Sequence, residues 1–132
     1  MRQNSTLLLL NGIVLGAVAL VQFVLDFAGY WGGLGPTGPA LHRNLDAIGF
    51  AEAHGLAAIL AVLFIVRRND GFVGWHAVAA AVHFLLGASN LIFWPLFVTW
   101  GLVPMGIAAT AMHATFFVLE GWALASAKIR QR

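Results

Sequence analysis

The sequence predicts an all-α fold: an antiparallel bundle of four transmembrane helices in an integral membrane protein, with both termini in the cytoplasm. Composition is the first observation behind this prediction. Of the 132 residues, 61% are hydrophobic and only 9% are charged, and the mean hydropathy is +0.87. Soluble proteins normally carry about a quarter charged residues. This chain therefore has too few charges to cover a water-exposed surface, and its expected surroundings are a lipid bilayer.

Four apolar stretches are the second observation. Cut at its polar and Gly/Pro-rich points, the sequence leaves apolar runs at 7–30, 47–66, 72–94 and 103–127. Each run is long enough for the roughly 20 residues that a spanning helix needs. In lipid, a helix satisfies all the backbone groups of a single span. Residues 1–132 are thus predicted to form one domain, with short loops at 67–71 and 95–104 and a longer glycine-rich connection after the first span.

The distribution of basic residues is the third observation. Six of the seven Lys and Arg residues fall on one side of the four-span arrangement, and only Arg43 falls on the other. The positive-inside bias then places both termini in the cytoplasm, and we expect the bacterial inner membrane. The net charge of +2 is explained by anchoring at the membrane surface, so no nucleic-acid partner is expected.

Five polar side chains fall in the outer half of the predicted spans. Counted at 1.5 Å of rise per residue, they lie between roughly 6 and 15 Å from the outer ends of their helices. They come from all four spans: Asp26, Glu52, His54, Asn90 and His113. An ionisable group within a membrane span indicates a functional site by default.

Two stripes of polar residues run deeper into the membrane. His76, His83 and Asn90 are spaced by seven residues, and so are His113 and Glu120. This spacing puts each set along one side of its helix. Because a lipid-facing histidine or carboxylate is costly, we expect both stripes to face the bundle interior.

The residue types restrict the chemistry. The chain has no cysteine, which excludes thiolate zinc sites, iron–sulfur clusters and cysteine nucleophiles. No two histidines within one span have the i, i+3 or i, i+4 spacing of a compact metal site. A haem needs only one or two histidines from separate helices and an apolar pocket between them. His54 and His113, at similar predicted depths, could supply one or both axial ligands.

The chain resembles styrene oxide isomerase, a small four-helix membrane enzyme. The resemblance covers the first three spans and is carried by "GGLGP" after the first, the "AH" pair at Ala53 and His54, and "GASNLIF" in the third. It implies a trimer that binds haem b and uses it as a Lewis acid to isomerise an epoxide to an aldehyde. His54 would be the ligand of the haem iron, and a small hydrophobic substrate would enter from the lipid.

The sequence departs from this family at the residues that act on the substrate. Leu60 replaces an asparagine that follows the ligand histidine, and Leu86 and Trp94 stand where the family has an acid and a tyrosine. In the haem hypothesis, Asn90 and His113 would line the distal side and take the catalytic role.

Two other hypotheses stay open. A small proton or cation channel or carrier could use a path of intramembrane His, Asp and Glu side chains, because such chains form proton relays. The candidate relay residues are Asp26, Glu52, His83 and Glu120. Alternatively, the polar residues could only hold the helices of an accessory subunit together. The pair Gly12 and Gly16 permits close helix packing within one copy or in a homo-oligomer.

Overall fold

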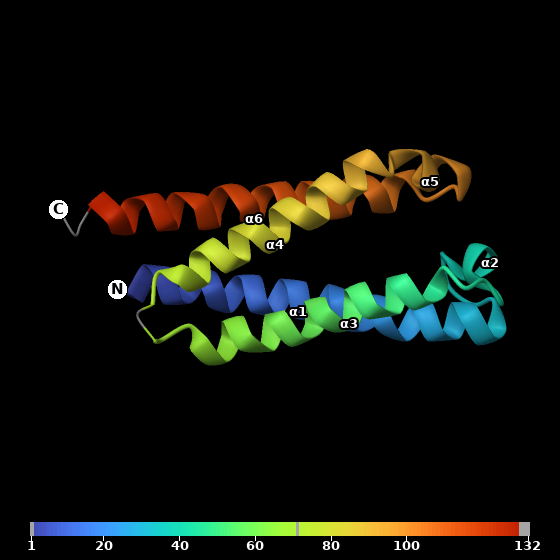
Figure 1. Cartoon of the computed structure of the whole chain (residues 1–132), viewed down its shortest axis with the longest axis horizontal. Coiled ribbons are helices and arrows are strands. Elements are labelled where there is room, and N and C mark those ends of the chain that lie inside the picture. The colour runs from blue at the N-terminus through green and yellow to red at the C-terminus, as the bar shows by residue number, and fades with distance from the viewer. Residues whose placement is uncertain (1, 71, 130–132) are drawn as a thin grey trace. The chain divides into compact units, whose positions relative to one another are not determined.

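The computed structural model of the chain describes residues 2–70 and 72–129 (Figure 1). All elements in this part are helices, namely α1 (Arg2–Gly32), α2 (Gly38–Leu41), α3 (Ala47–Arg67), α4 (Gly74–Ile92), α5 (Trp94–Thr99) and α6 (Val103–Ile129). Among the described residues, α1, α3, α4 and α6 are long and apolar enough to cross a membrane. The all-α prediction is confirmed, and the helices are compatible with an integral membrane protein.

The chain divides into two compact units. Residues 12–63 form one, called here the α1–α3 unit. The described residues of 1–11 and 64–132 form the other, called the α4–α6 unit. Each unit is described by itself below.

The α1–α3 unit is held together by close packing of small residues. A Cβ added to Gly16 of α1 would lie 3.2 Å from the Cβ of Ala61 on α3. Similarly, a Cβ on Gly55 would lie 3.1 Å from the ring of Phe23. The two helices run in opposite directions (Figure 1). Gly16 therefore permits close helix packing within one copy of the chain.

The connection between α1 and α3 begins with a helix-ending glycine. Gly33 has a φ of 65°, and its N–H donates to the carbonyl of Gly29 at 2.8 Å. This single bond from a left-handed glycine is the αL type of helix end, and the N–H of Leu34 also donates to the carbonyl of Ala28 at 3.3 Å. The sequence predicts turns here, and the structure adds the short helix α2.

In the α4–α6 unit, α4 and α5 both pack against α6. The sequence predicts a third span over 72–94, whereas α4 covers Gly74–Ile92. The predicted loop at 95–104 is wrong in its first half, because α5 occupies 94–99. Pro95 explains the break between the two helices, because it has no N–H to continue the hydrogen bonds of α4 and fits the first turn of α5.

Buried and exposed side chains differ from those of a soluble protein. The buried apolar residues are mostly alanines, including Ala19, Ala61 and Ala79. Large apolar side chains point outward instead, among them Leu20 and Val24, which are 58% and 59% exposed. Small residues at helix contacts are typical of helix packing in membranes, so this distribution is compatible with a lipid-facing surface.

Replacing Gly16 with leucine should disrupt the α1–α3 unit. The new side chain would have to occupy space already taken by Ala61, and overpacking of this kind costs roughly 1–3 kcal/mol. We expect a lower free energy of unfolding in detergent titrations. Gly49→Leu is the matched control, because a Cβ on this α3 glycine meets nothing within 4 Å. Equal stability of the two variants would contradict this packing.

Candidate functional site

The α1–α3 unit pairs a buried acid with a histidine. Asp26 and His54 are joined by a hydrogen bond of 2.6 Å between Oδ2 and Nδ1. The Asp26 side chain is 1% exposed, whereas that of His54 is 28% exposed. An ionised carboxylate only accepts hydrogen bonds, so Nδ1 of His54 carries the hydrogen. In the neutral ring, the other nitrogen, Nε2, then keeps a lone pair that lies outside this interaction.

The antiparallel helices explain why these two residues meet. Asp26 lies one turn before Tyr30 on α1, close to the end of the helix, and His54 lies two turns into α3 from the same end. The small residues Gly16 and Gly55 bring the helices close enough for a direct bond. The hydrogen bond shows that the side chains of Asp26 and His54 turn toward one another.

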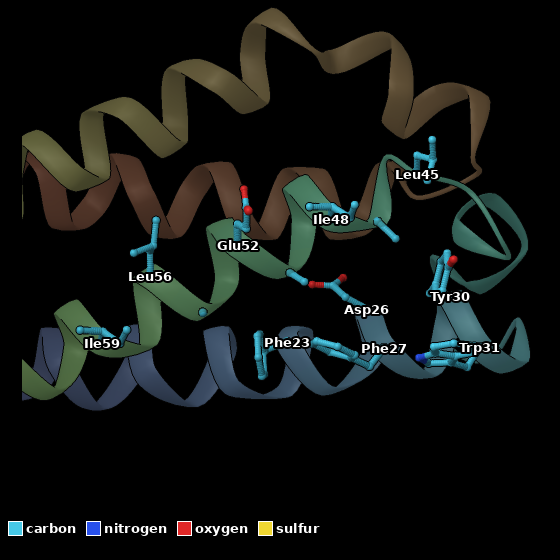
Figure 2. Close-up of a pocket in the computed structure, with 13 residues that line it drawn as sticks. Phe23, Asp26, Phe27, Tyr30, Trp31, Leu45, Ile48, Glu52, Leu56 and Ile59 are labelled. Atoms are coloured by element: carbon cyan, nitrogen blue, oxygen red, sulfur yellow. The ribbon is translucent and has the colours of Figure 1, made fainter.

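Glu52 has different surroundings from Asp26. It lies two residues before His54 on α3 and is exposed. In Figure 2 the Asp26 carboxylate lies between α1 and α3, whereas the Glu52 carboxylate points away from α1. The two predicted relay acids of this unit thus face different directions.

A continuous hydrogen-bonded network crosses the α4–α6 unit. His76 Nδ1 binds Glu120 Oε2, and Glu120 Oε1 accepts from Asn11 Nδ2 at 2.7 Å. Asn11 Oδ1 lies 2.8 Å from Nε2 of His83, whose Nδ1 lies 2.9 Å from Nδ1 of His113. All five side chains are buried. We call this set the five-residue network.

The network explains the seven-residue spacing in the sequence. His76 and His83 occupy one side of α4, and His113 and Glu120 occupy the side of α6 that faces it. The expectation that these four residues lie in the interior is confirmed. The ring of His83 also stacks on Phe116, with centroids 5.1 Å apart.

Sequence reasoning missed Asn11 and gave no role to His76. Asn11 interrupts the apolar run of the first span, and this break is the signal that could have identified it. Its amide links the acid of α6 to a histidine of α4. The seven-residue spacing places His76 on the polar stripe of its helix, but spacing within one helix does not predict its partner Glu120.

Asn90 lies beyond the five-residue network toward α5. A Cβ on Gly87 would contact the Cβ of His113 at 3.3 Å, which sets the register of α4 against α6. One turn further, Asn90 of α4 and Thr110 of α6 are at the same level. Asn90 Nδ2 and Thr110 Oγ1 are buried and have no hydrogen-bond partner in the described part of the chain.

The predicted axial ligands belong to different units. His54 pairs with Asp26 in one unit, and His113 pairs with His83 in the other. Among the described residues, no group of three or more His, Asp or Glu side chains could hold a metal ion.

Comparison with models of known protein families, with curated proteins and with solved structures gives no match to this chain. The resemblance to styrene oxide isomerase therefore stays a prediction.

The five-residue network should fix the tautomers of its histidines. Ionised Glu120 accepts from the Asn11 amide, so Asn11 turns its oxygen toward His83, whose Nε2 must donate. Nδ1 of a neutral His83 then accepts from Nδ1–H of His113. We expect nitrogen NMR of ring-labelled protein to show His83 protonated at Nε2 and His113 at Nδ1.

Two variants test whether Asn11 fixes the tautomers of His83 and His113. Asn11→Leu removes the group that orients His83, so both tautomers of His83 should then be populated. His42→Ala, in the exposed connection, should leave the His83 and His113 signals unchanged. Wild-type His113 protonated at Nε2 and bare at Nδ1 would contradict the inferred order of donors and acceptors.

Proposed function

We propose that this chain is an integral membrane protein that binds haem b, with Nε2 of His54 as an axial ligand of the iron. The hydrogen bond between His54 and Asp26 carries the proposal. Metal-ligating histidines almost always donate their other ring N–H to a carboxylate, carbonyl or water, which fixes the ring and strengthens the ligand. His54 donates from Nδ1 to a buried carboxylate and leaves Nε2 free to ligate.

The residues around His54 fit this role in part. Its ring is partly exposed on α3, and the Phe50 ring lies 6.4 Å away, centroid to centroid. The Phe50 ring would thus pack against one side of a flat apolar cofactor held by His54. A second face would have to come from another apolar surface, and a homo-oligomer, the trimer that the family resemblance implies, would supply one.

The finer proposal is an isomerase acting on small apolar epoxides. When bound, haem b would supply a Lewis-acidic iron. The chain would orient His54 through Asp26, and the exposed apolar helix faces would admit a hydrophobic substrate from lipid. His113 and Asn90, which belong to the α4–α6 unit, are the residues proposed to act on the substrate. Asn90 Nδ2 has no hydrogen-bond partner in the described part of the chain and would donate to an oxygen atom of the substrate.

The five-residue network gives less support to proton conduction. Its hydrogen bonds are continuous, but one link is the amide of Asn11. An amide donates from nitrogen and accepts at oxygen without being an acid or a base at ordinary pH. It therefore favours fixed hydrogen-bond directions between Glu120 and His83 over transfer of a proton between them.

The proposed membrane orientation places both termini in the cytoplasm. It rests on six basic residues on that side: Arg2, Arg67, Arg68, Lys128, Arg130 and Arg132. Arg43 lies in the opposite connection, and the proposed membrane is the inner membrane of a bacterium.

Haem binding should depend on His54 and be tuned by Asp26. Purified protein should show a Soret band that is lost in His54→Ala. Asp26→Asn should keep the band but weaken haem affinity by roughly 10–100-fold, the usual effect of losing an outer-shell partner. His42→Ala, at an exposed histidine, should behave as wild type.

His113 is tested with the same spectra. If it is a second axial ligand, His113→Ala should convert a six-coordinate spectrum to a five-coordinate one; if it lines the distal side, the coordination should stay the same. A wild-type protein that stays colourless after reconstitution with haemin would overturn the haem proposal, as would unchanged haem affinity in His54→Ala.

Orientation can be tested with single cysteines, because the chain has none of its own. Asp46→Cys lies in the connection before α3, and Asn69→Cys lies between α3 and α4; both positions are exposed. In intact cells, a membrane-impermeant maleimide should label Asp46→Cys and should reach Asn69→Cys only after permeabilisation. The reverse labelling pattern would show that the termini face outward.

A further inference from the structure

A groove with an acidic floor lies between α1 and α3. It has a volume of about 730 Å³ and lies entirely within the α1–α3 unit (Figure 2). Phe23 and Phe27 of α1 and Leu56 and Ile59 of α3 line it, with Tyr30 and Trp31 at the end near the α1–α3 connection. This volume is within the range of ligand pockets, roughly 300–1,000 Å³. His54 is not among the lining residues, but its partner Asp26 is, so the groove adjoins the proposed haem ligand without containing it.

The lining has negative charge without positive charge. Its acidic residues are Asp26 and Glu52, and none of its residues is Lys, Arg or His. Asp26 is 1% exposed, and its Oδ1 has no hydrogen-bond partner in the described part of the chain. Oδ2 already accepts from His54. If His54 is neutral, Asp26 keeps a negative charge at the wall of an apolar groove, where an unpaired charge is costly.

The negative charge of Asp26 and the aromatic side chains of the lining determine which ligand fits the groove. An ammonium group can donate to Asp26 Oδ1 and compensate its charge, and aromatic faces such as Phe23 and Tyr30 attract cations. An apolar body attached to it would lie along Leu56 and Ile59. A neutral lipid chain would fill the same walls but leave the carboxylate unpaired, and an anion would be repelled.

Arg43 does not line the groove, but it lies against the two aromatic rings at the end near the α1–α3 connection. The Arg43 guanidinium lies 4.7 Å from the centroid of the Trp31 ring and 5.8 Å from that of Tyr30. A ligand ammonium is therefore expected deeper, at Asp26, roughly 6 Å along α1 from Tyr30.

We propose that the groove between α1 and α3 binds a lipid-soluble amine in its protonated form, with Asp26 as its counter-ion. This site goes beyond haem binding and does not depend on it, so it is tested on haem-free protein.

The test compares two probes of the same shape, 1-naphthylmethylammonium and neutral 1-naphthalenemethanol, titrated calorimetrically into protein in an uncharged detergent. The amine should bind at least about tenfold more tightly than the alcohol, because charge-assisted hydrogen bonds are the stronger class. Asp26→Asn should remove this preference, and Glu52→Gln, at an exposed acid, should have the smaller effect. Equal binding of the two probes to the wild type, or a preference that survives Asp26→Asn, would overturn the proposal.

A second pair of variants keeps the test decisive if Asp26→Asn unfolds. Leu56→Trp fills the groove and should abolish binding of the amine. Val62→Trp is the matched control on α3, because Val62 is 58% exposed and does not line the groove; it should bind as wild type. Amine binding that persists in Leu56→Trp would place the ligand elsewhere.

Discussion

The structure depends on one constraint: a polar side chain buried among apolar helices needs a partner on a neighbouring helix. Asp26 and His54 meet this requirement across α1 and α3, and Glu120 meets it twice, with His76 and Asn11. A buried donor or acceptor left without a partner costs roughly 1–3 kcal/mol. These bonds therefore select one rotation for each helix, which the outward-facing apolar side chains could not do alone.

The same constraint separates the features that the sequence predicts from those that it does not. Helix positions follow from hydropathy, because the length of an apolar run and its breaks are local properties of the chain. The interior position of His83 and Glu120 follows from their seven-residue spacing with His76 and His113. Their partners do not follow, because each partner lies on another helix and pairing depends on helix register.

Two features show this dependence on contacts between helices, although the sequence marks the position of each. Asn11 stands alone in an apolar stretch with no periodic neighbour, yet it connects α4 and α6 within its unit. Helix α5 lies where the sequence has prolines and predicted a loop. There, Pro95 lies in the first turn of α5, and the ring of Phe97 fills the space beside Gly106. Both features depend on contacts between segments and not on local composition.

Direction matters as much as pairing in these hydrogen bonds. A carboxylate only accepts, so the hydrogen on a neutral histidine beside it is fixed on the facing nitrogen, and the far nitrogen becomes an acceptor. Asp26 acts in this way on Nδ1 of His54, which leaves Nε2 of that ring with a lone pair. Glu120 acts at longer range through the Asn11 amide, which donates to Glu120 and accepts from Nε2 of His83. Nδ1 of His83 then accepts from Nδ1 of His113. A buried acid in each unit thus leaves neutral histidines with a lone pair on Nε2: Asp26 acts on His54, and Glu120 acts on His76 directly and on His113 through the network. This is the form in which imidazole ligates iron or accepts a proton.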